Sequence, residues 1–205
     1  MVIAQAHNPT ILHPAFLKAQ GVVPPDWEPS EPPVCTPAIS VVTYPNRITF
    51  TADISKFQVL DNAPGGKSQI PELATNYVGL LPHVHYTAVG INIASLVERD
   101  EPEKWIIERF LKPGPWNEGQ FQLEAVEFRF VYPVDHGLLH LKCSVGSVVG
   151  ATGEPEKPCV MIDGNYHVNI SPKNALEETE SVIAMFSSRL EHFGSIAECV
   201  FEAKV

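Results

Sequence analysis

The histidines are the residues of this chain whose type and spacing could perform chemistry. His83 and His85 lie two positions apart, and residues two apart on a β-strand point to the same side. Two imidazoles on one side of a strand can form half of a metal site, which needs one or two further ligands. Candidates for these ligands are His136, His140, His167, Asp135 and Asp163. The pattern gives the hypothesis of a metal site at His83 and His85. The alternative is that all of these are polar residues at strand ends and on solvent faces.

Other stretches resemble catalytic or binding motifs but lack a required residue. The stretch 62–68 ends in Gly-Gly-Lys-Ser, but a Walker-type phosphate loop needs a glycine where this chain has Asp61. We interpret it as a glycine-rich connecting turn. The stretch 144–147 does not match the Gly-x-Ser-x-Gly nucleophile elbow. Glu124 and Glu127 are three apart, so they point to opposite sides of a regular strand and make a poor acid–base pair.

A polar stripe marks one face of a predicted strand near the C-terminus. Its members alternate with apolar residues and are Asp163, Asn165, His167 and Asn169. Such a stripe can line a cleft, or it can be the solvent face of an edge strand. Regular alternation of polar and apolar residues favours the solvent face.

Composition excludes several classes of protein. The 205 residues carry 24 acidic and 14 basic side chains, a net charge of -10, which argues against a general nucleic-acid binder. The apolar fraction of 44% suits a chain that buries a core, and no apolar run approaches the ~18–20 residues that cross a bilayer. The first seven residues have no basic stretch typical of a secretory signal. The four cysteines contain no CxxC pair, which is typical of a reduced chain. We therefore expect a cytoplasmic protein with no nucleic-acid or membrane partner and no cofactor.

Proline dominates the N-terminal part of the chain. Eight prolines lie between Pro9 and Pro37, and proline removes a backbone donor, so this stretch is expected neither in a central sheet nor in a long helix. One short helical turn is predicted over 14–20. We predict an extended arm over residues 1–34, tied down by apolar side chains, of which Phe16, Leu17 and Trp27 are the candidate interface residues. The arm would staple its own domain or clasp a second copy of the chain.

The remaining residues, 35–205, are predicted to form one α+β domain. Alternation predicts strands over 38–44, 47–53, 56–60, 83–97, 120–132, 138–149 and 157–170. Apolar spacing predicts helices over 69–81 and 100–112, and a third that begins at Ser171-Pro172 and that Gly194 could interrupt. Three consecutive strands joined by short turns require antiparallel pairing. The predicted fold is a mostly antiparallel sheet of about six to seven strands with three helices, preceded by the proline-rich arm.

Three stretches of the domain resemble a known group of proteins. They are the run Tyr86–Ile93, the strand Val160–Asp163 and the helix that carries Phe186. Together they resemble half of a sporadically distributed bacterial family of uncharacterised proteins. Ala88 stands where that family has an arginine. The resemblance spans residues 38–193 and implies an α+β sheet closed by a C-terminal helix, with no catalytic residue to transfer.

Three functional hypotheses follow from the sequence. The first is a non-enzymatic interaction or assembly protein that self-associates through the N-terminal arm, indicated by the apolar anchors of the arm and by the incomplete catalytic motifs. The second is a small-molecule-binding domain with a cleft between sheet and helices. The third is a metal-assisted hydrolase that uses His83 and His85.

Overall fold

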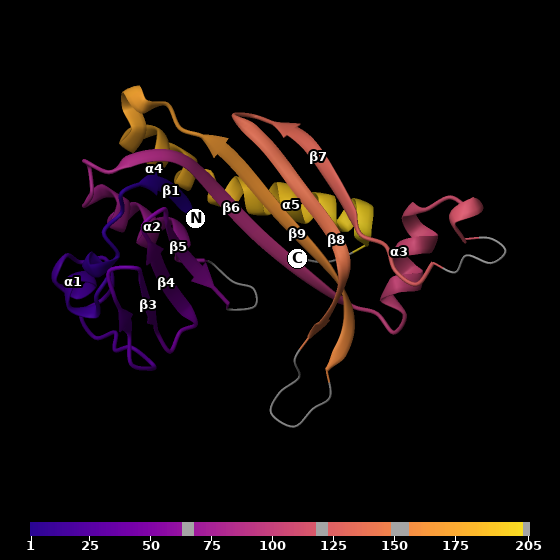
Figure 1. Ribbon diagram of the computed structural model, residues 1–205, viewed down its shortest axis with the longest axis horizontal. Helices are drawn as coiled ribbons and strands as arrows, with labels where there is room; N and C mark the ends of the chain where they lie inside the picture. Colours follow the sequence, from indigo (N-terminus) through magenta and orange to yellow (C-terminus); the bar gives the residue numbers. More distant parts are fainter. Residues whose placement is uncertain (63–67, 118–122, 149–155, 203–205) are drawn as a thin grey trace. The chain divides into compact units, whose positions relative to one another are not determined.

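Antiparallel strand pairing organises this α+β chain, seen in a computed structural model that describes residues 1–62, 68–117, 123–148 and 156–202 (Figure 1). The strands are β1 (Val2–Gln5), β2 (Val34–Cys35), β3 (Ile39–Thr43), β4 (Ile48–Asp53), β5 (Lys56–Asp61), β6 (His85–Glu98), β7 (Phe128–Val134), β8 (Gly137–Val148) and β9 (Lys157–Asn169). They form one open sheet in the order β2-β3-β4-β5-β1-β6-β9-β8-β7. The α-helices are α1 (Pro14–Ala19), α2 (Ile70–Gly79), α3 (Pro102–Phe110), α4 (Ala175–Ala184) and α5 (Phe186–Phe201).

The α+β class with an antiparallel sheet is confirmed, but the predicted number of elements is wrong. The described residues contain nine strands and five α-helices instead of six to seven strands and three helices. Both additional strands, β1 and β2, lie in or at the edge of the segment expected to be an extended arm. The predicted C-terminal helix is divided at Met185 into α4 and α5, and α5 runs through Gly194 without a break.

The chain forms two compact units. Unit 1 comprises Met1–Ile91 and His167–Arg189, and unit 2 comprises Asn92–Tyr166 and Leu190–Val205. Each unit has its own set of strands, and the long strands β6 and β9 contribute residues to both.

Strand β1 lies in the interior of the sheet of unit 1, which the proline pattern did not predict. It pairs antiparallel with β5 on one side and with β6 on the other, with Val2 opposite both Phe57 and Val89. The backbone N–H of Ala4 also donates to the carbonyl of Ser55 at 2.9 Å. The restriction imposed by proline begins only at Pro9, so the backbone of the first residues is free to bond on both sides.

The proline-rich segment packs into the core of its own unit. Four apolar side chains of this segment are buried in one cluster with residues of β3, β4, β5 and α2. They are Leu12, Leu17, Val22 and Val23. Trp27 lies against this cluster with its ring 5.1 Å from that of Tyr44, and the aromatic contacts continue through Phe50 and Phe57 to Tyr77. Apolar burial within the chain therefore holds a segment that has little secondary structure of its own.

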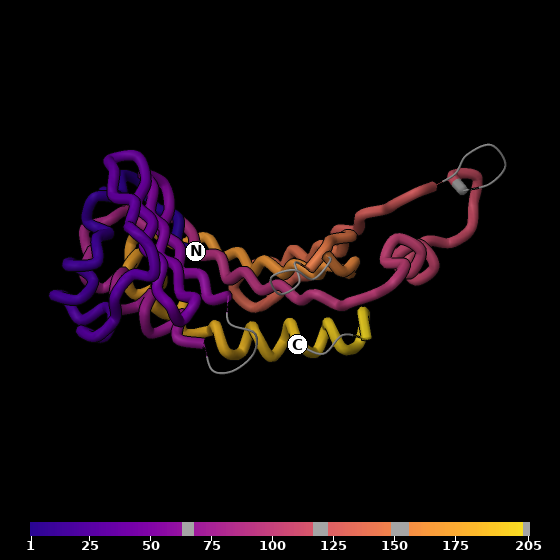
Figure 2. Tube along the Cα trace, turned by 90° about the horizontal axis from the view of Figure 1, so that it is seen from below, coloured from indigo at the N-terminus to yellow at the C-terminus, as the bar shows by residue number. Residues whose placement is uncertain are grey.

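Helix α5 covers one face of the strands of unit 2 (Figure 2). Both sides of this contact carry buried side chains. On β8 and β9 they are Leu139, Leu141, Ile162 and Tyr166, and on the helix they are Phe193, Ala197 and Phe201. A Cβ placed on Gly164 would lie 2.7 Å from the Phe193 ring, so the helix approaches the strand closely because glycine stands there. The buried side chains on either side of Gly194 explain why this helix tolerates a glycine in its interior.

The strand predicted over 120–132 is shifted toward the C-terminus. Residues 123–127 are not in a strand, and β7 continues through Pro133 to Val134. Val134 then pairs with Gly137 across a loop of two residues, in which His136 has a φ of 63°. Proline is compatible with this position because β7 is the last strand of the sheet.

Within the described ranges, no helix is both long and apolar enough to span a membrane.

Removing a buried side chain of the proline-rich segment should destabilise the whole of unit 1. We expect Leu17→Ala, at a site with 0% exposure, to lower the free energy of unfolding by about 2–5 kcal/mol. Val34→Ala is the matched control, because Val34 is exposed and its loss should change stability by about 0.5 kcal/mol or less. Denaturant unfolding measures both. An unchanged stability of Leu17→Ala would show that the segment is not part of the core.

The buried His7 should make stability depend on pH. His7 is 6% exposed, its Nε2 has no hydrogen-bond partner among the described residues, and its ring lies 6.3 Å from that of Tyr86. Burial lowers the pKa of His7 below its ordinary value of 6.5, while the carboxylate of Asp53 acts in the opposite direction. The unfolded chain therefore binds the proton more readily. The stabilisation is complete above pH 6.5 and is lost as the pH falls toward the folded-state pKa.

We expect His7→Phe to remove this part of the pH dependence of unfolding. His83→Gln changes an exposed imidazole of the same unit and should leave the dependence intact. Urea unfolding of the three proteins over a pH series provides the measurement. Parallel pH profiles for the parent chain and His7→Phe would contradict this account.

Candidate functional site

The face of the unit 2 strands opposite α5 carries a group of polar side chains, which we call the open face. Because side chains alternate along a strand, the residues next to the buried ones point to this side. The open face comprises Asn92 on β6, Arg129 and Val131 on β7, Leu138, His140 and Lys142 on β8, and Asp163 and Asn165 on β9. The register of β7 and β8 places Arg129 beside Lys142 and Val131 beside His140.

Hydrogen bonds and ion pairs fix the polar side chains of the open face. The Arg129 guanidinium lies 2.9 Å from Nδ1 of His140, and because arginine can only donate, Nδ1 must accept and the ring proton sits on Nε2. Lys142 forms an ion pair of 2.9 Å with Glu127. The side-chain amide of Asn165 donates to the side-chain oxygen of Asn92. Most of the polar groups therefore satisfy one another across neighbouring strands.

Asp163 is the ionisable group of the open face with an unfavourable environment. Partial burial raises the pKa of its carboxyl group above the ordinary value of 3.8, the nearby Lys142 lowers it, and Glu127 raises it again. In its ionised form this carboxylate opposes folding, because desolvation outweighs the attraction of Lys142. A carboxylate in such a position is available to a ligand or partner that supplies a donor.

The polar stripe predicted on β9 lies along a partly covered strand face. Asp163, Asn165 and His167 are half-buried and Asn169 is exposed. His167 lies within hydrogen-bond distance of Asn169, with 3.2 Å between Nε2 and Oδ1. Asp163 and Asn165 belong to the open face of unit 2, whereas His167 and Asn169 belong to unit 1.

Strand β7 is the second feature of unit 2 that is open to a partner. It is the terminal strand of the sheet, and no described element pairs with its outer side. Val131 is 50% exposed on the open face. On the other face, the rings of Phe128, Phe130 and Tyr132 form a row in which the centres of neighbouring rings are 6.2 and 6.4 Å apart. The opposite edge strand, β2, has only two residues and lies between Pro33 and Pro37. Prolines and short length protect that edge, but β7 is long enough to accept another strand.

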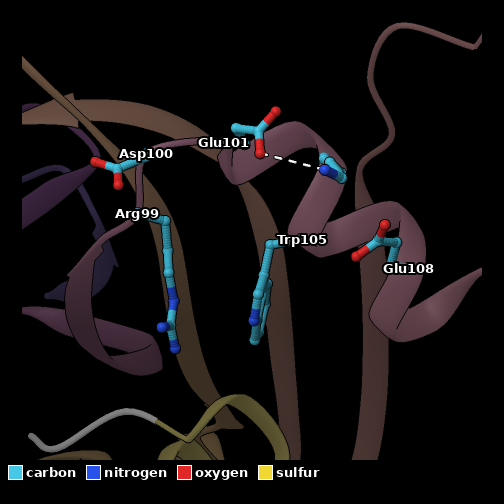
Figure 3. Close-up of a pocket in the computed structure, with 6 residues that line it drawn as sticks. Arg99, Asp100, Glu101, Trp105 and Glu108 are labelled. Carbon is cyan, nitrogen blue, oxygen red and sulfur yellow. Dashed lines mark hydrogen bonds and ion pairs between the residues drawn. The ribbon is translucent and has the colours of Figure 1, made fainter.

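A hollow beside α3 brings a cation and an aromatic ring together (Figure 3). The Arg99 guanidinium lies 5.2 Å from the centre of the Trp105 ring, and its Nε is buried without a hydrogen-bond partner in the described part of the chain. The dashed line at Glu101 is its ion pair of 3.3 Å with Lys104. Asp100 and Glu108 complete the rim of the hollow. This geometry suits a cation–π contact with a partly desolvated arginine.

The structure does not bring His83 and His85 together with a third metal ligand. His83 lies in a turn and His85 begins β6, and both are exposed. Over the described ranges there is no group of three His, Cys, Asp or Glu side chains that could hold an ion. Of the other candidates, His140 is engaged by Arg129, and His136 sits in the β7–β8 loop.

The three candidate interface residues of the N-terminal segment all pack inside unit 1. Leu17 is fully buried, whereas Phe16 and Trp27 are partly exposed against the same core. The flanking Lys18 and Glu28 form an ion pair that ties α1 to the segment after it. This packing in cis explains how the segment is held, and a contact with a second copy stays a prediction.

The remaining sequence candidates are the glycine-rich stretch 62–68 and the four cysteines. Asp61 accepts a hydrogen bond of 3.0 Å from the hydroxyl of Ser68, and the Gly-Gly-Lys part of the glycine-rich stretch lies outside the described residues. Cys143 and Cys159 are buried, and burial raises the pKa of the Cys143 thiol to about 11, which makes it a poor nucleophile. The other two cysteines, Cys35 and Cys199, are exposed.

The sequence did not single out the residues that form these surface features. They are Arg99 and Trp105 in the hollow beside α3, and Arg129, Val131 and Lys142 on the open face. Pro133 was the available signal for β7, because proline within a run of alternating residues marks an edge strand. The strand predicted over 120–132 ends just before this proline. The pairing of Arg129 with His140 depends on strand register, which the sequence does not give directly.

Comparison with known proteins adds no relative: no protein-family model matches the chain, and neither the curated proteins nor the solved structures contain a significant match. The resemblance to the sporadically distributed bacterial family therefore stays a hypothesis. The class that the fold defines is an α+β protein with one open antiparallel sheet.

The raised pKa of Asp163 gives a test of the electrostatics of the open face. The folded chain holds this proton more tightly than the unfolded chain, so the contribution of Asp163 to stability falls as the pH rises above 3.8. We expect Asp163→Asn to gain stability relative to the parent chain over this rise in pH. Asp100→Asn, an exposed carboxyl of the same unit, should not show this gain. Thermal unfolding over the pH series decides, and a relative loss of stability in Asp163→Asn would contradict the assignment.

Proposed function

We propose that this chain is a non-enzymatic interaction protein that self-associates. The observation that carries the proposal is the unprotected edge strand β7, which borders a sheet face with exposed apolar side chains. Val131 and Leu138 are 50% and 42% exposed on the neighbouring strands β7 and β8. The register places Val131 opposite His140 and Leu138 opposite Pro133. A long free edge beside apolar surface is the usual site at which another strand adds to a sheet.

Two surfaces are candidates for this self-association. One is the edge of β7, and the other is the N-terminal segment through Phe16 and Trp27. The segment already buries Leu17 and Val23 within its own chain, so only the exposed parts of Phe16 and Trp27 are available to a second copy. The β7 edge, in contrast, has its whole outer side without a described partner. The difference in available surface favours β7.

A small-molecule-binding function is the second candidate, and the hollow beside α3 is the observation that favours it. A buried Arg99 Nε without a described partner is a donor that a ligand carboxylate could satisfy, with Trp105 supplying apolar contact. The acidic rim of the hollow weakens the attraction for an anion. The metal-assisted hydrolase receives no support from the positions of His83 and His85.

We expect the purified chain to change from monomer to dimer as its concentration rises through the micromolar range. Sedimentation equilibrium measures the mass without a surface or label. Trp27→Ala should leave the dimer dissociation constant unchanged if β7 provides the contact, although it removes a ring that packs against Tyr44 and so lowers stability. A monomer at every concentration would overturn the proposal. Loss of the dimer in a folded Trp27→Ala chain would assign the contact to the N-terminal segment instead.

A further inference from the structure

The free backbone groups of β7 can be assigned from its hairpin with β8. Val134 and Gly137 close a loop of two residues, and the closing pair of such a loop exchanges hydrogen bonds. In an antiparallel ladder the bonding direction alternates along the strand. Phe128, Phe130 and Tyr132 therefore direct their N–H and C=O groups to β8, whereas Arg129, Val131 and Pro133 direct theirs to solvent. Since proline has no N–H, the outer edge of β7 offers two donors, at Arg129 and Val131.

This arrangement is complementary to itself when β7 meets a second β7 in the antiparallel sense. Only residues that direct their groups outward can bond across the new pair, so Arg129, Val131 and Pro133 must face one another. Placing Arg129 opposite Val131 of the second strand brings Phe130 opposite its own copy. Each of the four free donors of the two strands then has an acceptor. Shifting the register to place Val131 opposite itself would set Pro133 against Arg129, where the proline ring occupies the place of a donor.

The side chains fit the same register. On the aromatic face, Phe128 would stand opposite Tyr132 of the second strand, so the half-buried aromatic row of each chain is extended by the other. Cross-strand aromatic pairs stabilise antiparallel sheets. On the open face, Arg129 would pack over the exposed Val131, and the two Arg129 side chains would not lie directly opposite each other. The alternative that places Arg129 opposite itself sets like charges together.

We propose that two copies of this chain join through β7, paired antiparallel about a two-fold axis at Phe130, so that the sheets of the two copies become continuous. The partner is a second copy of the same chain, and the inference rests on the proposed self-association. The pairing is isologous, because each β7 gives and receives the same bonds. Growth therefore stops at the dimer along this edge.

Two substitutions at Val131 test the contact and its register. Val131→Pro removes a donor that faces solvent in the monomer, so the hairpin with β8 is retained, but the dimer loses two bonds and meets the proline rings. We expect the dissociation constant of the dimer to rise about tenfold or more. Val131→Glu places a carboxylate opposite Arg129 of the second copy, twice per dimer. We expect this variant to bind about 2- to 30-fold more tightly at low salt, with the gain lost at high salt.

Leu96→Glu is the matched control. It adds the same charge to the same unit, on β6 instead of β7, at a side chain that is 50% exposed like that of Val131, and should leave the dissociation constant unchanged. Far-UV circular dichroism and the unfolding midpoint establish that each variant is folded. Sedimentation equilibrium of the parent chain and the three variants supplies the dissociation constants.

The outcomes separate this inference from the proposed function. A dimer that is weakened by Val131→Pro and strengthened by Val131→Glu supports the inference. A dimer indifferent to both variants overturns it and leaves self-association through another surface in place. Weakening by both variants overturns the register at Phe130, because two glutamates would then oppose each other at position 131. A parent chain that stays monomeric overturns both the inference and the proposed function.

Discussion

The satisfaction of backbone hydrogen bonds is the constraint on which the rest of this structure depends. In the order of the described strands, β5 and β6 do not pair with each other, and β1, with four residues, lies between them. The first residues of the chain therefore complete the sheet of unit 1, and the segment from Pro9 to Trp27 follows from there across its core. At the other end of the order, the outer side of β7 has no described protein partner, and its backbone groups face solvent.

Much of the fold could be predicted from the sequence, because local periodicity reports which face of an element is buried. The alternation of Ile48, Phe50 and Ala52 predicted β4, and the apolar spacing of Leu73 and Tyr77 predicted α2. Strand β1 could not be found this way. It is too short for a pattern, and its position depends on pairing with Phe57 and Val89, far away in the sequence. The register that places Arg129 beside Lys142 depends on a loop whose length was misjudged at Pro133.

The candidate site was harder to predict than the fold because it depends on what is uncovered rather than on what is packed. The sequence singled out His83 and His85, which are exposed and remain without a third described ligand. It also singled out Phe16, Leu17 and Trp27, whose apolar character is explained by packing within unit 1. The sequence alone does not distinguish an apolar side chain that is buried from one that is exposed. The difference for Val131 is its position: it lies on β7, where the sheet ends, and it is 50% exposed.

Concentration-dependent amide hydrogen exchange at Arg129 and Val131 tests the central claim most directly, because it observes the two backbone donors themselves. If β7 pairs with a second copy, these two amides should exchange rapidly in dilute solution and become protected as the dimer forms, while the amides of Phe130 and Tyr132 are protected throughout. Arg129 and Val131 amides that exchange rapidly at concentrations where the chain is dimeric would contradict the account.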